Sequence, residues 1–324
     1  MGHSFQFMIK EADEGRRLDE FFASRFGSLS RMRIASLIEA GSCHVNGDFA
    51  RAGYKLVAGD SIDVSFDEGA PTAMTPEPIP LEIVYEDEQV IVVVKPAGML
   101  VHPTLGVKTG TLANALAYHL NRPRIEGGRW GVASPLSDVE PVVRPGMIHR
   151  LDRATSGLMV MAKPPRALTV LSRHFRRRLV EKRYLALVAG AVEEQSGSIS
   201  AQIGRDPDKR PRWGVMDSGR QAETKFKVLE RMAESTLLEL EPVTGRTNQL
   251  RIHCAYIGHP IIGDQMYGEC ADAEADSRNT ETKMRLCLHA SSLSFHHPVG
   301  GEWMEFTSPL PDDFKGIVDQ YRGK

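Results

Sequence analysis

Hydrophobic residues recur at two different spacings along the chain, and the change from one to the other marks the expected helices and strands. Four apolar residues fall at helical spacing within residues 18–26, and residues 28–41 begin with a serine suited to a helix N-cap and end at a glycine suited to a C-cap. Residues 42–66 then contain short apolar runs broken by Asn-Gly and Gly-Asp turn dipeptides. This pattern predicts a first domain over residues 13–66, with two short helices followed by short strands.

The composition changes after residue 66. Residues 67–80 are rich in proline, threonine and acidic residues, which favours an extended linker over a packed element. We therefore assign residues 1–12 to an N-terminal tail, residues 67–80 to a linker and residues 81–324 to a second, larger domain.

The larger domain contains more predicted strands than helices. Residues 81–96 are typical of two strands around an acidic turn, and residues 109–120 of a helix that begins near a threonine. Further strands are expected at residues 156–163, 182–190, 222–230 and 235–243, and further helices at residues 164–180 and 247–258. We expect a mixed α+β fold with a largely antiparallel sheet, and a polar mobile loop over residues 268–282.

Charge is distributed unevenly along the chain. The formal net charge is only -2, but the segment from Arg144 to Arg183 contains eleven lysines or arginines against two acidic residues. The helix expected within this segment carries most of its arginines away from its apolar face. That apolar face is formed by Leu168, Leu171, Phe175 and Leu179. Such a segment indicates a polyanion-binding face, although a solvated basic helix would have the same composition.

Several classes of function lose their usual sequence support. The chain has no run of 18 apolar residues and no signal-peptide pattern at its N-terminus, so we expect a cytoplasmic protein without a membrane span. It has no phosphate-binding or dinucleotide-binding glycine motif, and its eleven histidines match no ligand spacing, so we expect neither cofactor nor metal. The four cysteines form no C-x-x-C pair and are expected to be reduced: Cys43, Cys254, Cys270 and Cys287.

One carboxylate, Asp152, lies in the arginine-rich stretch "HRLDRATSGL". Neighbouring guanidinium groups favour the ionised carboxylate, which suits a nucleophile or a base better than a general acid. An ion pair that holds a turn would fit the same residues. A hydrolase centred on Ser156 and His149 is a weaker alternative, because Ser156 lacks the first glycine of a nucleophile elbow.

Five segments in the same order give the chain a specific resemblance. They are "VVVKPAGMLVHP", "HRLDRATSGLMVMAK", "EKRYLALVAG", "TGRTNQLRIHCAYIGHPIIGD" and "LCLHASSLSFHHP". Together they resemble the signature of the RluA/RluD-type RNA pseudouridine synthases. The resemblance implies an isomerase that converts uridine in RNA to pseudouridine, with no cofactor or energy source.

The resemblance also implies roles for individual residues. Asp152 matches the acid required for breaking the glycosidic bond, Tyr184 the tyrosine that stacks on the target base and accepts a proton, and Arg251 the partner of the acid. Arg150 matches an arginine that enters the RNA where the flipped base had been. Substrate contacts are implied for three more residues: His149, Arg246 and Leu288, with Leu286 as the alternative to Leu288.

Residues 13–66 resemble the alpha-L RNA-binding motif of ribosomal protein S-four. The resemblance implies that its basic residues face phosphates, with Arg31 and Arg33 preferred over the other three: Arg16, Arg17 and Lys55. A structural appendage with solvated arginines is the alternative. The combined layout is similar to members that modify large-subunit ribosomal RNA, and transfer RNA is the alternative substrate.

The chain departs from the family pattern at one position. The family commonly has R-T-H-Q where this sequence has Arg246-Thr247-Asn248-Gln249. Asparagine still donates and accepts hydrogen bonds, so only a role for a titrating imidazole is in doubt. A non-catalytic RNA-binding protein of ribosome assembly is the competing hypothesis, and we expect a monomer in either case.

Overall fold

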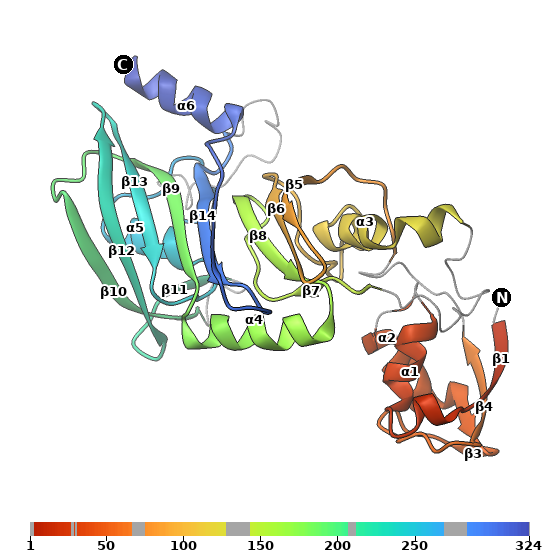
Figure 1. Ribbon diagram of the computed structural model, residues 1–324. Helices are drawn as coiled ribbons and strands as arrows, with labels where there is room; N and C mark the ends of the chain where they lie inside the picture. The colour runs from red at the N-terminus through yellow and green to blue at the C-terminus, as the bar shows by residue number, and fades with distance from the viewer. Residues whose placement is uncertain are drawn as a thin grey trace. The chain divides into compact units, whose positions relative to one another are not determined.

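The computed structural model describes residues 3–26, 29, 31–66, 75–127, 143–206, 212–268 and 284–323 (Figure 1). The chain forms two compact units. The first comprises residues 1–81 and 100–145, and the second comprises residues 82–99 and 146–324. The loop expected over residues 268–282 lies outside the described residues, apart from residue 268.

The first unit contains a four-stranded sheet in the order β1-β4-β2-β3. Helix α1 covers Leu18–Arg25, and buried Leu18, Phe21, Phe22 and Phe26 fill the core as their helical spacing predicts. The second predicted helix is present as α2, Arg31–Leu37, continued by the π-helical turn η2, Ile38–Ser42. The strands that follow are β2 (Cys43–Val45), β3 (Asp48–Phe49) and β4 (Ser61–Phe66).

The assignment of residues 1–12 to a tail is wrong for residues 3–8. These residues form β1, His3–Met8, which pairs antiparallel with β4. Phe5 and Phe7 alternate with polar residues. Phe5 packs against Phe26, which directly follows α1, and Phe7 packs against Phe21 of that helix. Residues at this end of the chain therefore belong to the sheet and its core.

Helix α3, Leu112–Glu126, begins after a threonine, as predicted for residues 109–120. This residue, Thr111, forms a capping box with Asn114. The contacts of α3 group it with the first 81 residues, whereas a division at residue 80 would separate them. Both carboxylate oxygens of Glu77 accept from the Gly110 N–H at 3.0 Å, and the Asn114 amide donates to the Thr75 carbonyl at 2.8 Å. The described end of the expected linker is thus bonded to the start of this helix.

The second unit is built on an eleven-stranded sheet with the path β11-β10-β12-β13-β9-β14-β8-β6-β5; β15 pairs with β14 and β7 with β8. Of the described strand pairs, only β14 and β8 are parallel, so the prediction of a largely antiparallel α+β fold is confirmed. The strands are β5 (Glu82–Glu86), β6 (Val90–Lys95), β7 (Gly146–Met147), β8 (Ser156–Ala162), β9 (Glu181–Ala189), β10 (Ser196–Arg205), β11 (Trp213–Val215), β12 (Arg220–Arg231), β13 (Ser235–Pro242), β14 (Leu288–His296) and β15 (Trp303–Thr307).

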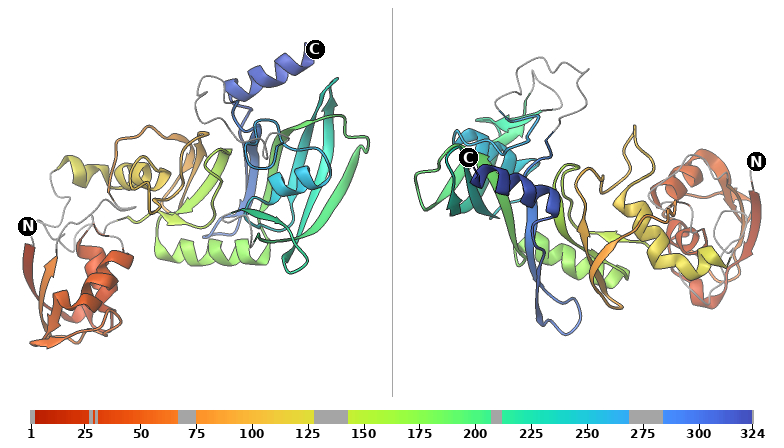
Figure 2. Two further views of the ribbon diagram at one scale, coloured as in Figure 1. Left: turned by 180° about the vertical axis from the view of Figure 1, so that it is seen from behind. Right: turned by 90° about the horizontal axis from the view of Figure 1, so that it is seen from above.

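The described residues of this unit also form the helices α4 (Pro165–Arg177), α5 (Gln249–Tyr256) and α6 (Asp312–Arg322). Figure 2 shows α5 against the strands β10 to β13. Leu250 and Cys254 of this helix belong to the apolar core of the unit. In α4 the buried Leu171 follows the prediction, but Leu179 is 46% exposed. The reason is that Arg178 adopts a left-handed conformation and ends the helix before it reaches Leu179.

Candidate active site

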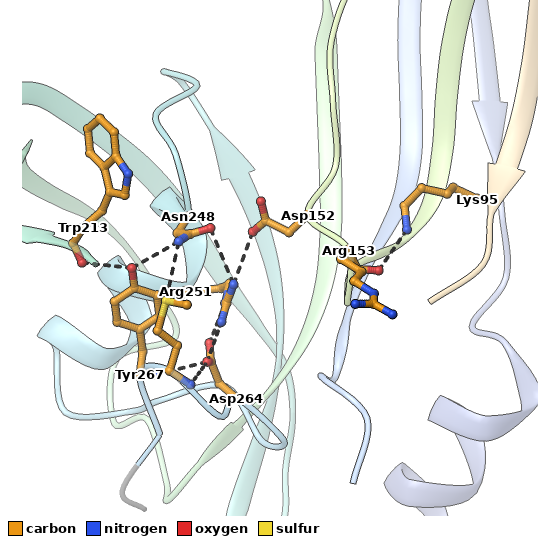
Figure 3. Close-up of polar contacts among 9 residues, drawn as sticks. Lys95, Asp152, Arg153, Trp213, Asn248, Arg251, Asp264 and Tyr267 are labelled. Carbon is orange, nitrogen blue, oxygen red and sulfur yellow. Dashed lines mark hydrogen bonds and ion pairs between the residues drawn. The ribbon is translucent and has the colours of Figure 1, made fainter. Parts of the chain in front are cut away.

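The sequence-predicted residues of the larger domain meet in one cleft of the second unit. This cleft has a volume of about 740 Å³ and lies between the loop before β8, the start of β9 and the loop that leads into α5. Asp152 projects from the loop between β7 and β8 (Figure 3). Seven of the residues singled out in the sequence line the cleft: His149, Arg150, Asp152, Tyr184, Arg246, Arg251 and Leu288.

Arg251 holds one guanidinium nitrogen towards Asp152. Its Nη1 lies 3.5 Å from Asp152 Oδ2, and the two side chains are 11% and 27% exposed. The other edge of the guanidinium forms two hydrogen bonds of 2.7 Å to Asp264, whose side chain is fully buried (Figure 3). Asp264 Oδ1 also accepts the backbone N–H groups of Met266 and Tyr267. Asp264 therefore fixes the fork that faces Asp152.

Electrostatics keep Arg251 charged. Burial alone would lower the pKa of its guanidinium, but the hydrogen bond and charge of Asp264, with a further contribution from Asp152, raise that pKa above its ordinary value. Asp152 therefore faces a permanent cation. A carboxylate in this position has the chemistry of a nucleophile or a base.

Asn248 contacts Asp152 from the position where the family pattern commonly has histidine. It precedes α5 with a left-handed backbone, at φ 54°. When the amide is oriented to satisfy its neighbours, its nitrogen donates to Asp152 Oδ2 at 2.9 Å and its oxygen faces the Tyr267 hydroxyl at 3.1 Å. Figure 3 draws the opposite orientation, in which two oxygen acceptors would face each other at 2.9 Å. We prefer the first orientation because it places a donor, rather than a second acceptor, against the oxygens of Asp152.

Tyr184 lies on β9 and is partly buried against the cleft. Burial, with a smaller contribution from the charge of Asp152, raises the pKa of its phenol above the ordinary value. The hydroxyl therefore stays protonated at neutral pH. This favours stacking and hydrogen-bond donation over the role of a proton acceptor.

Comparison with known proteins decides the identity of this fold and cleft. Residues 89–256, more than half of the chain, match the family model described as RNA pseudouridylate synthase. The chain belongs to the RNA pseudouridine synthase family. The prediction of an RluA/RluD-type member, and hence of an isomerase that acts on RNA, is confirmed.

Relatives match this pseudouridine synthase over nearly its full length. An uncharacterised RNA pseudouridine synthase of Bacillus subtilis is 38% identical over 96% of both chains. The ribosomal large subunit pseudouridine synthase D of Pasteurella multocida is 37% identical over 96% of this chain and 93% of its own. The structure of human RNA pseudouridylate synthase domain containing 1 covers 76% of this chain and 97% of its own, at 26% identity and a TM-score of 0.55.

In this synthase His149 has a structural environment. Its Nε2 accepts the backbone N–H of Val160 at 3.1 Å, and its ring stacks on Phe175 with centroids 4.8 Å apart. Burial, and then the charge of Lys182, lowers the pKa of His149 to about 3. Because Nε2 of the neutral imidazole already accepts a hydrogen bond, it is not available as a base. The substrate contact that the resemblance implies for His149 is therefore limited to apolar packing.

The hydrolase alternative fails on geometry. Ser156 is buried, its hydroxyl lies 2.9 Å from His289 Nδ1, and it accepts from Arg285 at 2.7 Å. His149 bonds to Val160 rather than to Ser156. The serine is therefore an internal hydrogen-bonding group.

Lys95, from the first of the five resembling segments, supports the loop of Asp152. Its buried ammonium donates to the carbonyls of Pro96, Met99 and Arg153 at 2.8, 2.9 and 3.2 Å (Figure 3). Burial lowers the pKa of Lys95 to about 7, against the opposing charge of Asp152. The bond to Arg153 fixes the residue directly after the candidate catalytic acid.

The remaining predicted residues have different surroundings. Leu288 is buried at the wall of the cleft, and Leu286 is buried in the core of the same unit. Arg150 is exposed, and Arg246 is held by a bond from its Nε to the Gln221 carbonyl at 3.2 Å. In the first unit Arg31 forms an exposed ion pair with Glu20 at 2.7 Å, while Arg16 and Arg17 pair with Asp13 and Asp19.

Two residues of the site were not singled out in the sequence. Asp264 and Tyr267 complete the network around Arg251 and Asn248, and Asp264 ends the resembling segment "GHPIIGD". Among the described residues no group of three or more His, Cys, Asp or Glu is arranged to hold a metal ion. Within the same residues, no helix has the length and apolar character needed to cross a membrane.

Proposed function

We propose that this synthase isomerises uridines in large-subunit ribosomal RNA and that Asp152 is its catalytic carboxylate. Relatives of 35 to 37% identity from Pasteurella, Xanthomonas and Vibrio carry the name ribosomal large subunit pseudouridine synthase D. The observation that carries the residue assignment is the pairing of Asp152 with Arg251 inside the cleft. Within the part of the chain that the structure describes, the other two acidic residues of the lining, Glu181 and Glu241, have no contact of this kind with a buried arginine.

The reaction exchanges one bond to the ribose for another. The bond from C1′ to N1 of uracil breaks, the uracil turns while bound, and a bond from C1′ to C5 forms. C5 loses its proton and N1 gains one, so atoms balance without an added reactant. Asp152, paired with Arg251, acts as nucleophile or base on the target nucleotide.

Access to the uridine requires the base to leave its stack, which costs a few kcal/mol. The aromatic face of Tyr184 and the apolar surface of Leu288 provide the stacking and packing that offset part of this cost. Basic residues around the cleft provide charge for the phosphates: Arg150, Arg176, Arg178, Lys182, Lys225 and Arg246. Arg150 is exposed, and we assign it to the space in the RNA that the flipped uracil leaves.

Mapping of pseudouridine tests the substrate. Ribosomal and transfer RNA from a deletion strain and its parent are treated with carbodiimide and examined by primer extension. We expect a stop in large-subunit ribosomal RNA that is present in the parent, absent in the deletion strain and restored by the purified enzyme. A difference confined to transfer RNA would refute the ribosomal assignment while leaving the isomerase intact.

A further inference from the structure

A second hollow adjoins the active-site cleft within the second unit. Its volume is about 450 Å³, and it lies where β10 and β11 meet the loop that leads into α5. Gly245, Arg246 and Thr247 line both hollows. A ligand that extends beyond the cleft on this side would therefore enter the second hollow.

The chemistry of this hollow suits a nucleotide. It is lined by an aromatic ring, Trp213, and by three guanidinium groups from Arg205, Arg220 and Arg246, with no Asp or Glu among its described lining residues. Trp213 and Arg205 are directly opposite across the pairing of β10 and β11, and Arg205 Cζ lies 5.6 Å from the centroid of the indole. An indole with cations around it provides a stacking surface for a base and charge for its phosphate.

The Trp213 side chain is partly buried, and the Arg205 guanidinium lies over its ring. The side chain packs against the small core of Ile203, Ile252 and Tyr267. The backbone carbonyl of Trp213 accepts a hydrogen bond from the Tyr267 hydroxyl at 2.9 Å. Its indole N–H makes no hydrogen bond with the described residues. Arg205 and Arg220 are exposed. The ring is thus held in place without its polar edge being used internally.

We propose that the hollow at Trp213 binds a nucleotide of the RNA strand that neighbours the target uridine. Its base stacks on Trp213, and its phosphates contact Arg205, Arg220 and Arg246. Arg246 borders both hollows, so it is placed to bind the phosphate that joins the two nucleotides. This inference rests on the proposed action of the cleft on RNA and adds a subsite that helps to select and hold the strand.

The test separates strand binding from chemistry. Ribosomal RNA tritiated at C5 of uridine and isolated from a deletion strain is the substrate, and Kd is measured on the same RNA with Asp152→Asn as the background to prevent turnover. We expect Trp213→Ala to raise both KM and Kd about tenfold, the effect of losing one stacked base, with kcat unchanged. Trp213→Phe should restore most of the affinity.

Two further variants control for folding and position. Arg205→Gln with Arg220→Gln alters only exposed side chains and should lower the slope of log Kd against log salt by about 0.7 for each phosphate that the protein no longer neutralises, whereas Trp213→Ala should leave that slope unchanged. Trp303→Ala removes a part-exposed indole that lies outside both hollows and should change neither KM nor Kd.

The inference and the proposed function can fail separately. Wild-type KM and Kd in Trp213→Ala or in the double arginine variant, with Asp152→Asn inactive, would overturn the subsite alone. A loss of kcat rather than affinity in Trp213→Phe would also overturn it, because the ring would then act through the active-site network. Full activity of Asp152→Asn would instead overturn the function proposed for the cleft.

Discussion

Asp264 determines how Arg251 is presented to the candidate catalytic acid. It is fully buried and occupies two nitrogens of the guanidinium, so only one edge is left for Asp152. Removing one partner of a buried pair leaves the other charge poorly compensated. The geometry of the acid therefore depends on a carboxylate that does not reach the substrate.

Substitution of Asp264 tests this dependence. We expect Asp264→Asn to lower the free energy of unfolding by about 3 kcal/mol in urea and to lower kcat. The control is Glu230→Gln, which breaks an exposed pair with Arg322 and should leave both quantities within error. Equal stability of Asp264→Asn and wild type would show that Arg251 is held by other contacts.

Asn248 offers a second test at the residue scale. Asn248→Asp would place a carboxylate about 2.9 Å from Asp152, where both groups cannot be ionised together. Activity at neutral pH should fall, and the acidic limb of the pH profile of kcat/KM should move to higher pH. Asn248→His retains a donor and should keep the wild-type profile at neutral pH. An unchanged acidic limb in Asn248→Asp would show that Asn248 does not contact the acid.

The local elements were predictable where caps and alternation are strong. A helix that begins near a threonine was predicted over residues 109–120, and β8 and β9 were predicted from their apolar runs. Strand β10 was missed because its sequence, "SGSISAQIGR", is rich in Gly and Ser and poor in strand-forming residues. In the site, the resemblance located Asp152, Tyr184 and Arg251, but the bonds of Asn248, Asp264 and Tyr267 depend on how the loop before α5 folds.

Buried neutral histidines make the stability of the second unit depend on pH. Burial lowers the pKa of His149 to about 3 and of His253 and His289 to about 4, well below the ordinary 6.5. The unfolded chain binds these protons at a higher pH than the folded chain does. The free energy of unfolding should therefore fall as pH decreases from about 6.5 towards 4.

The contribution of His149 can be isolated. His149→Gln removes one titrating group, so the fall of stability with pH should become less steep by about 1.4 kcal/mol per pH unit in this window. Urea unfolding at several pH values measures the slope. His119→Gln, a change outside the second unit, serves as the control. An unchanged slope in His149→Gln would mean that this imidazole is charged in the folded protein.

At the scale of the whole molecule, the sequence misplaces one boundary. Bonds from residues 75 and 77 to the start of α3, and from Arg144 to the Ala23 and Phe26 carbonyls, join segments far apart in the chain. Such contacts have no local pattern, so the grouping of residues 100–145 with the first unit was not predictable. Deletion of the N-terminal residues would consequently also remove contacts of residues 100–145.

The role of the first unit is best tested in the full chain. We expect Arg31→Gln with Arg33→Gln to weaken binding to structured ribosomal RNA several-fold and to reduce its salt dependence, with kcat unchanged at saturation. Arg322→Gln, an exposed arginine of α6, is the matched control. Equal losses in both would indicate an effect of overall charge rather than of the alpha-L motif.

The central claim is that Asp152 performs the isomerisation of uridine in the cleft. Its most direct test is tritium release from RNA labelled at C5 of uridine, compared between wild type and Asp152→Asn at equal RNA occupancy. The account predicts release by the wild type, none above background from Asp152→Asn, and the same Kd for both. Equal release by the two proteins would contradict it.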